Sequence, residues 1–416
     1  MFQVATAQLS FCEASEISMS RKQLIEMTRR HMAHAKAGSV DQAPDVFRVP
    51  AAHYCDPQRG QLERTQIWRR LPLMLGFSAE LGEKNTYRAM EVAGFPVLLT
   101  RDGSGEIRAF VNMCSHRGSQ IVAEGVGQAR RFVCPYHGWT YNVEGSLVGI
   151  LDSAEFGELD RSCLGLTPLP ASERAGMIFV VLRPQESFDF EAYFQGYDEI
   201  LEHLGLGDCH VVGRQSVDGP NWKIAYDGYL DFYHLPILHR ESFGSEIGNK
   251  AVYDNWGPHQ RVNMPFPGME KLEEKPEADW PDAVLLAGIW TIFPHISIAT
   301  FDADGPLYMV SQLFPGEAVD ESITLQTFLS PQAPDAKHQA KIQQQMKFLH
   351  HVVQDEDYAT GIKIGRALAT GTKKNVLFGR NEGGGQRFHS WVDALVETDD
   401  DGLPELFARQ VGPTVR

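Results

Sequence analysis

Four residues in two short motifs have the chemistry and spacing of a metal site. Cys114 and His116 are separated by one residue, and after residues 117–133 come Cys134 and His137, separated by two. Thiolates and imidazoles in such a set suit tetrahedral zinc. They also suit a two-iron cluster in which two thiolates hold one iron and two imidazoles hold the other. Because each motif mixes one ligand of each kind, the sequence favours the two-iron cluster over zinc.

A second group of metal-ligand residues lies about 100 positions further on. Asp227, Asp231 and His234 follow one another at intervals of four and three residues, which places them on one face of an expected helix. Burying two carboxylates and an imidazole is costly without a partner, and a bound cation would offset that cost. Pro236 ends the expected helix, so the backbone can turn His239 towards the same point. A hydrogen-bonded core residue remains the alternative for either histidine taken alone.

Both groups resemble motifs of one known family. The segments "CSHRG" (114–118) and "CPYHGW" (134–139) are similar to the Rieske iron–sulfur motif. They match its oxygenase branch, because Tyr136 stands where respiratory members carry an extra cysteine. The pattern Asp-x-x-His-x-x-x-x-His that ends at His239 resembles the iron site of Rieske non-haem iron oxygenase alpha subunits, which include aromatic-ring-hydroxylating dioxygenases such as naphthalene dioxygenase.

The resemblance implies a role for each of these residues. The implied ligands of a [2Fe–2S] cluster are Cys114, His116, Cys134 and His137, and those of a mononuclear Fe(II) are His234, His239 and Asp357. Asp357 is preferred over Asp355 because the pair "ED" at 356–357 matches the family and because the two aspartates point in nearly opposite directions on a helix. Asp231 is the implied bridge between the two centres, and Asp227 stands where many members have Asn. His389 is expected to be a structural or pocket-wall histidine.

Composition excludes several classes of protein. The 416 residues carry a formal net charge of −16 and are 43% apolar, as expected for a globular chain with more than one core. No extended basic cluster indicates a nucleic-acid partner, and no apolar run approaches the roughly 20 residues that cross a bilayer. The N-terminus has none of the features of an export signal. We therefore expect a cytoplasmic protein whose cysteines are metal ligands or free thiols.

Hydrophobic patterning predicts three regions. Residues 1–43 contain a helix at 19–36 that is expected to pack on the catalytic domain. Residues 44–175 hold short strands joined by the turns "RDGSG" and "NVEG", which predict an all-β Rieske domain with both metal loops at hairpin tips. Residues 176–416 mix helices and strands, an α+β pattern for which the resemblance implies a helix-grip catalytic domain with an antiparallel sheet around a long helix. Its expected elements are helices at 191–205, 221–235 and 336–368 and strands at 289–301, 305–316 and 321–331.

The resemblance also implies a function and partners. The chain is expected to be the terminal oxygenase of a multicomponent system that activates O2 at the mononuclear iron and hydroxylates an aromatic or other hydrophobic small molecule. A separate NAD(P)H-dependent flavin and iron–sulfur reductase, with or without a ferredoxin, would supply electrons to a homotrimer, with or without a beta subunit. A monooxygenase performing demethylation or aliphatic hydroxylation is the alternative, and a non-catalytic Rieske electron carrier is a third. The substrate pocket is expected beside the helix at 222–239 and near Trp290, Ile292, Phe293 and Phe314.

Overall fold

The computed structural model describes residues 18–184, 187–266 and 268–415. Among these residues no helix is both long enough and apolar enough to cross a membrane. The expectation about an export signal concerns residues 1–17, which lie outside the described part of the chain.

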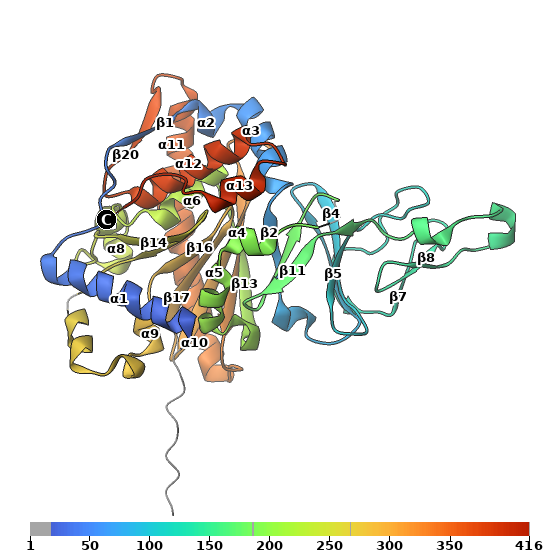
Figure 1. Ribbon diagram of the computed structural model, residues 1–416, viewed down its shortest axis with the longest axis horizontal. Coiled ribbons are helices and arrows are strands. Elements are labelled where there is room, and N and C mark those ends of the chain that lie inside the picture. The colour runs from blue at the N-terminus through green and yellow to red at the C-terminus, as the bar shows by residue number, and fades with distance from the viewer. Residues whose placement is uncertain (1–17, 185–186, 267, 416) are drawn as a thin grey trace, which may run out of the picture.

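The first helix, α1 (Met19–Ala37), agrees with the predicted helix at 19–36. The side chain of Ser18 accepts a hydrogen bond from the backbone N–H of Arg21 and caps the start. Gly38, with φ of 61°, ends the helix in the left-handed conformation that glycine adopts without steric cost. Arg30 then ties α1 to the rest of the chain through a salt bridge of 2.8 Å to Asp254. α1 therefore lies along the large domain (Figure 1).

A β domain projects from one end of the molecule (Figure 1). Its strands form a five-stranded sheet in the order β10-β5-β4-β3-β6 and two three-stranded sheets, β11-β12-β2 and β7-β8-β9. The predicted turn "RDGSG" joins β4 to β5, where an Asp102 oxygen accepts hydrogen bonds from the backbone N–H groups of Ser104 and Gly105. The strands are β2 (Pro72–Phe77), β3 (Thr86–Val92), β4 (Phe95–Arg101), β5 (Ile107–Val111), β6 (Gly125–Gln128), β7 (Arg131–Val133), β8 (Thr140–Asn142), β9 (Leu147–Gly149), β10 (Pro168–Leu169), β11 (Ala171–Arg174) and β12 (Met177–Val181).

The large domain is built on one antiparallel sheet of seven strands in the order β13-β19-β18-β17-β16-β15-β14. Together with its helices, this sheet gives the expected α+β fold. Buried aromatic and aliphatic side chains such as Trp290 and Phe293 fill the main core. The strands are β13 (His210–Gly219), β14 (Val252–Trp256), β15 (His259–Asn263), β16 (Ile289–Ile292), β17 (Ile296–Asp302), β18 (Pro306–Pro315) and β19 (Ser322–Ser330).

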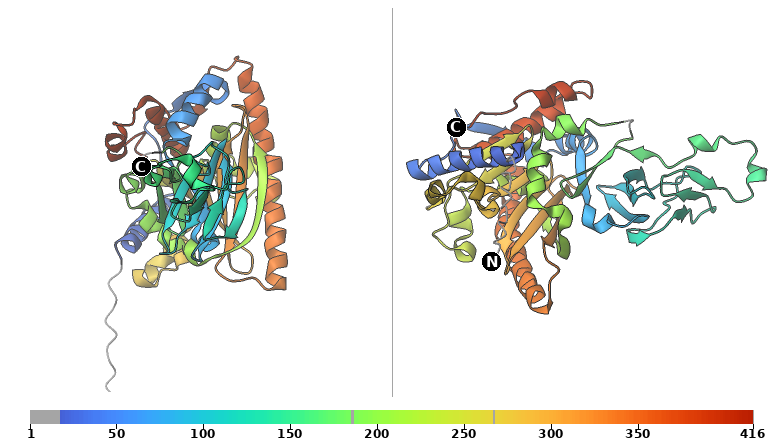
Figure 2. Two further views of the ribbon diagram at one scale, coloured as in Figure 1. Left: turned by 90° about the vertical axis from the view of Figure 1, so that its right-hand side faces the viewer. Right: turned by 60° about the horizontal axis from the view of Figure 1, so that its bottom comes forward.

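The long helix predicted at 336–368 is a continuous rod along one side of the large domain (Figure 2). It consists of α10 (Ala336–His351), a π-helical segment (Val352–Tyr358) and α11 (Ala359–Ala369). A π-helical segment inside an α-helix is frequently found at functional sites, and this one carries the predicted ligand Asp357.

Other helices cover the remaining faces of the large domain. The predicted helix at 191–205 is broken, because Gln195 and Gly196 have φ values of 53° and 78°. The helices are α2 (Ala52–Cys55), α3 (Pro57–Glu63), α4 (Phe190–Phe194), α5 (Tyr197–Leu201), α6 (Trp222–Leu230), α7 (Leu235–Leu238), α8 (Arg240–Phe243), α9 (Asp282–Leu285), α12 (Gly383–Glu397) and α13 (Leu403–Ala408).

The segment 47–68 contacts the large domain, although we expected the β domain to begin at residue 44. Strand β1 (Phe47–Pro50) pairs with β20 (Asn375–Phe378), which follows the long helix. Glu63 of α3 accepts a hydrogen bond of 2.5 Å from the buried ammonium of Lys223 in α6. Backbone pairing and a buried ion pair thus hold this segment on the catalytic side, and β2 is the first strand of the projecting domain.

Candidate metal centres

The two predicted cluster loops have the same backbone geometry. In the first loop the N–H of Cys114 donates to the carbonyl of Ser119 (2.8 Å), and the N–H of Gly118 donates back to the carbonyl of Cys114 (2.9 Å). Gly118 has a φ of 77°, a conformation that side chains other than glycine rarely adopt.

The second loop repeats both hydrogen bonds. The N–H of Cys134 donates to the carbonyl of Trp139 (2.8 Å), and the N–H of Gly138, with φ of 70°, donates to the carbonyl of Cys134 (3.0 Å). These loops lie at the free end of the β domain, one after β5 and the other between β7 and β8. The second loop is at the tip of the β7–β8 hairpin, as predicted, whereas the first connects β5 to β6, which do not pair with each other, so the predicted hairpin tip is wrong there.

The four predicted cluster ligands converge with the cysteines inside and the histidines outside. Cys114 and Cys134 are both buried, whereas the rings of His116 and His137 are partly exposed and lie 4.7 Å apart. Trp139 stacks on the His116 ring at 4.9 Å. Two buried thiols opposite two outer imidazoles are the donor set of a Rieske cluster.

The surroundings of Cys134 favour the thiolate that a metal requires. Burial raises the pKa of this thiol, but the backbone N–H groups of Tyr136 and His137, together with the side chains of Cys114 and Ser119, lower it by more, so that the pKa is lowered overall. On the other cysteine, the Tyr141 hydroxyl lies 3.2 Å from the sulfur of Cys114. Hydrogen bonds to the sulfur atoms stabilise negative charge and help set the potential of such a cluster.

His234, His239 and Asp357 meet at a second point, in the large domain. The Nε2 atoms of the two histidines lie 3.1 Å apart. The Oδ1 atom of Asp357 lies 3.1 Å from Nε2 of His239 and 3.7 Å from Nε2 of His234. Two imidazoles and one carboxylate within 4.8 Å of one another form a group that can hold a metal ion, and such a facial set suits Fe(II) with open positions for other ligands.

A carboxylate holds the outer nitrogen of each of these histidines. Oδ2 of Asp231 lies 3.1 Å from Nδ1 of His234, and Oε2 of Glu356 lies 2.7 Å from Nδ1 of His239. Each carboxylate fixes the tautomer that leaves Nε2 free to bind a metal. Glu356 is also held by the Ser242 hydroxyl at 2.5 Å. No role was predicted for Glu356, and its adjacency to Asp357 is the one signal of its role in the sequence.

The histidines reach this point by a different route from the predicted one. Helix α6 ends at Leu230, and Asp231 has extended backbone dihedrals with φ of −117°. Its Oδ1 accepts a hydrogen bond of 2.5 Å from the N–H of Tyr233, a local side-chain interaction that competes with the helix. The expected shared helix face of Asp227, Asp231 and His234 is therefore wrong, and Pro236 lies in the first turn of the short helix α7 instead of ending α6.

Asp227 faces a different set of partners. Its Oδ2 accepts a hydrogen bond from the Tyr54 hydroxyl at 3.0 Å, and its Oδ1 lies 2.9 Å from Nε2 of His389. The Tyr54 hydroxyl and His389 Nε2 are themselves 2.9 Å apart. Burial, followed by the charge of Asp227, raises the pKa of Tyr54 well above its usual value. His389 is thus a buried partner of Asp227, whereas nothing in the sequence pointed to Tyr54.

The side chains of Asp355 and Asp357 point in different directions, as expected if only one of them is the third metal ligand. The Asp355 side chain is 60% exposed and lies 2.7 Å from Nδ1 of His351, one turn earlier. Only Asp357 of the two meets the histidines. The π-helical segment leaves Glu356 on the metal side as well, which an α-helical projection does not predict.

A groove of about 300 Å³ opens beside these residues. Its lining includes the carboxylates Asp227, Asp231, Asp357 and Glu382 and no lysine or arginine. Burial raises the pKa of Glu382, and the charges of Asp231 and Asp227 raise it further although the Gly379 N–H opposes them. The groove is therefore rich in negative charge with no positive side chain in its lining.

The predicted pocket wall is not found in this groove. Trp290, Ile292 and Phe293 are fully buried in the main core, and Phe314 lines a different pocket, next to the β domain. Phe293 packs against Phe388 of α12 and Trp290 against Tyr197 of α5. The groove is instead lined by α6, α11, β20 and Tyr54.

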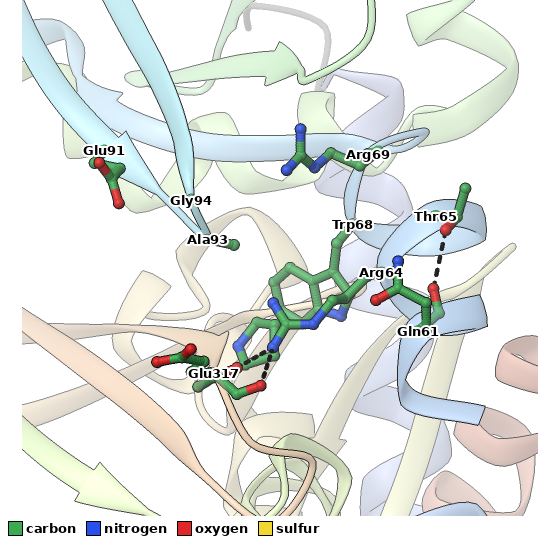
Figure 3. A pocket seen from close by; sticks show the side chains of 11 residues that line it. Gln61, Arg64, Thr65, Trp68, Arg69, Glu91, Ala93, Gly94 and Glu317 are labelled. Carbon is green, nitrogen blue, oxygen red and sulfur yellow. Dashed lines mark hydrogen bonds between the residues drawn. The ribbon is translucent and has the colours of Figure 1, made fainter. Parts of the chain in front are cut away.

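A larger cavity of about 750 Å³ lies where the two domains meet (Figure 3). Arg64, Trp68 and Arg69 line it from one side, and the Ala93–Gly94 turn and Glu317 line it from others. It contains none of the predicted metal ligands, so size alone does not identify the candidate site.

Family models match both domains. A model of the Rieske [2Fe-2S] domain matches residues 72–159, and a model described as the ring hydroxylating alpha subunit (catalytic domain) matches residues 206–398. The two matches include every predicted metal ligand.

Individual proteins are similar over parts of their length. Choline monooxygenase of Beta vulgaris, a chloroplastic protein, is 31% identical over 51% of this chain and 51% of its own. The glycine betaine monooxygenase oxygenase subunit of Chromohalobacter salexigens is 29% identical over 51% and 48%. The chain thus spans about half the length of these curated relatives. Naphthalene 1,2-dioxygenase from Rhodococcus sp. bound to indole shares the fold, with a TM-score of 0.71 at 22% identity over 92% of this chain and 100% of that one.

Proposed function

The chain belongs to the family of Rieske-type ring-hydroxylating oxygenase alpha subunits, and on that premise we propose that it is the terminal oxygenase component of a multicomponent system. A separate reductase would supply its electrons, because the sequence has no glycine-rich phosphate loop between a strand and a helix with which to bind a nicotinamide nucleotide. The observation that carries the proposal is the convergence of His234, His239 and Asp357 in a chain that also has the Rieske donor set.

The residues of the site have distinct tasks in this proposal. When bound, the cluster would supply single electrons and the mononuclear iron a centre for reductive activation of O2. Asp231 and Glu356 hold the Nδ1 protons of His234 and His239, so that both Nε2 lone pairs point into one space. Asp227 is kept in place by Tyr54 and His389 at the wall of the groove.

We propose a small quaternary ammonium compound as the substrate class, hydroxylated in a monooxygenase reaction. This was the alternative to the aromatic hydrocarbon that we expected from the sequence. The four carboxylates of the groove support it, because a cation offsets their mutual repulsion, which adds to the larger effect of burial in raising the pKa of Glu382. Choline and glycine betaine, named for two relatives, are cations of this class or carry its cationic group.

We also propose that the working unit is a ring, most simply a trimer, in which one copy's cluster serves its neighbour's iron site. The loops around β7 and β8 and the helix α8 beside His239 lie at opposite ends of the molecule (Figure 1). Both ends expose apolar side chains: Tyr136 is 59% exposed at the cluster loops and Ile237 is 81% exposed near the iron site. A head-to-tail contact between unlike ends closes into a ring.

Iron content and product mass test the proposal. The purified protein should hold three irons per chain and give a Rieske electron paramagnetic resonance signal on reduction. A chain with two irons per molecule and no turnover would instead be an electron carrier. With a reconstituted electron donor, incubation with choline or glycine betaine should give products that carry one oxygen atom from O2, whereas a gain of two hydroxyl groups on aromatic test compounds would identify a dioxygenase.

A further inference from the structure

A row of polar side chains runs across the middle of the catalytic sheet. Ser297 of β17 is directly opposite Ser311 of β18, and Ser311 is directly opposite Gln326 of β19. Directly opposed residues of antiparallel strands have their side chains on the same face and close together. All three are buried, with exposures of 1%, 0% and 0%. Polar groups at the centre of a sheet are costly unless they have partners.

This row faces the elements that carry the candidate iron site. Thr324, two residues before Gln326 and so on the same face of β19, shares a hydrogen bond of 2.6 Å with the Tyr358 hydroxyl. Tyr358 follows Asp357 in the π-helical segment, and α6 packs across β16 and β18 on this side. The row therefore lies beneath α6 and the segment 352–358.

Tyr229 of α6 adds a fourth polar group to the row. Burial raises the pKa of its phenol, and Ser311, Tyr358 and Gln326 lie near enough to lower it, although none of them reaches hydrogen-bonding geometry. Tyr229 also lines the groove beside Asp357. Its ring thus connects the groove to the row.

The polar atoms of these four residues make no hydrogen bond of ordinary geometry among the residues that the structure describes, although Tyr229 lies close to Ser311 and Gln326. They are the hydroxyls of Tyr229, Ser297 and Ser311 and the Nε2 amide of Gln326. The other end of the Gln326 amide is already used, because its Oε1 accepts from Nε2 of Gln215 at 2.7 Å. What remains free is a set in which every member can donate a hydrogen bond. Buried polar groups without partners require an explanation such as a ligand or an ordered water molecule.

We infer that this row, called here the donor row (Tyr229, Ser297, Ser311 and Gln326), binds the carboxylate of a zwitterionic quaternary ammonium substrate. The inference rests on the proposed function. A carboxylate offers two oxygens and about four lone-pair sites to several donors, whereas an alcohol offers one oxygen. The row has no lysine or arginine to balance the negative charge of a carboxylate. The ligand must therefore carry a positive group of its own, as a zwitterion does. The cationic end then lies towards the carboxylates of the groove.

Binding to the intact iron-loaded protein tests the inference. The probes are trimethylglycine, which is another name for glycine betaine, and choline. Both carry a trimethylammonium group, and trimethylglycine has a carboxylate where choline has a hydroxymethyl group. Isothermal titration calorimetry gives both dissociation constants for the wild type, Ser311→Ala and Ser297→Ala. Ser330→Ala is the matched control, because Ser330 is equally buried on β19 but lies outside the row and has a partner in the Gln332 N–H.

The expected result is selective. Each row variant should weaken trimethylglycine binding by roughly 10-fold or more, since a hydrogen bond to a charged group is lost, and should leave choline binding and the melting temperature of the ligand-free protein unchanged. Unchanged trimethylglycine binding in both row variants would mean that the row holds water only, and equal weakening of both probes would exclude a carboxylate-specific contact. If the wild type with three irons binds neither probe, the proposed substrate class fails, and the donor row assignment with it.

Discussion

At the scale of single residues, the candidate metal ligands are easier to recognise in the sequence than the residues that orient them. The paired cysteines and histidines are indicated by residue type and spacing, whereas Asp357, far from them in the sequence, was implied only by the family resemblance. Their orienting partners have no fixed spacing: Glu356 holds His239 across 117 positions, and Tyr54 holds Asp227 across 173. Only the folded chain identifies such partners.

The choice of Asp357 as the third iron ligand leads to a first prediction. Asp357→Ala removes the one carboxylate that meets both histidines, so the protein should lose its mononuclear iron and all turnover. Asp355→Ala is the control, because the exposed Asp355 contacts His351 and not the site. Iron analysis should fall from three to two per chain in the first variant only, with the Rieske signal intact in both. Loss of iron from Asp355→Ala alone would place the ligand two residues earlier.

Glu356 leads to a second prediction, because it orients His239 without belonging to the predicted ligand set. Glu356→Gln removes the negative charge behind Nδ1, and the affinity for the metal should fall by roughly 10- to 100-fold. Competition with a chelator measures this affinity directly, with Co(II) as a second metal. Glu241→Gln changes an exposed acid of the neighbouring helix α8 and should have no effect. Equal affinities in the two variants would assign Glu356 a purely structural role.

At the scale of elements, periodicity predicted most helices and strands but not where a side chain interrupts them. The α1 helix, the strands at 289–330 and the long helix follow from repeated apolar positions and clear caps. The end of α6 does not, because Asp231 captures the N–H of Tyr233 and competes with the helix before Pro236 is reached. The break after α4 likewise depends on positive φ values at Gln195 and Gly196. The first interruption is a local contact between a side chain and the backbone and the second is a backbone conformation, and apolar periodicity indicates neither.

The link between α3 and α6 leads to a third prediction. Lys223 and Glu63 form a fully buried pair at 2.5 Å, which fixes segment 47–68 on the helix that precedes the iron site. Lys223→Met removes one partner of the buried Glu63 carboxylate and leaves it only the Arg59 guanidinium and the Trp222 indole N–H. The free energy of unfolding should therefore fall by about 1.5–3 kcal/mol. The double variant with Glu63→Gln should recover most of this loss. Lys341→Met, which breaks an exposed pair with Asp304, should cost less than about 1 kcal/mol.

Urea denaturation of the iron-loaded proteins measures all of these variants. The midpoint should shift strongly for the buried single variant and little for the double and the surface variants. A buried variant that is as stable as the surface one would show that this pair does not fix the segment.

At the scale of the whole molecule, strands β7 and β8, which flank one candidate centre, and helix α8, which follows His239 of the other, lie at opposite ends of the molecule (Figure 1). Sequence similarity alone places both in one polypeptide but cannot say which copies work together. Asp231 is a suitable contact point, since its side chain is 25% exposed and one of its oxygens already holds His234. Its other oxygen accepts from the Tyr233 N–H and retains a lone pair. His137 of a neighbouring copy could donate to this carboxylate.

Complementation between two defective chains tests this arrangement. Cys114→Ser should lack the cluster but keep the mononuclear iron, and His234→Ala should lack that iron but keep the cluster. Each homogeneous assembly should be inactive. Co-expressed chains that mix at random should recover roughly a quarter of wild-type turnover, because a cluster-bearing copy must stand beside an iron-bearing copy in a fixed head-to-tail order. Asp231→Asn in the Cys114→Ser chain should abolish that recovery while both metals remain bound, because the carboxylate at the contact is lost. Mixed assemblies without any turnover would place the working pair of centres within one chain, and recovery despite Asp231→Asn would remove Asp231 from the contact.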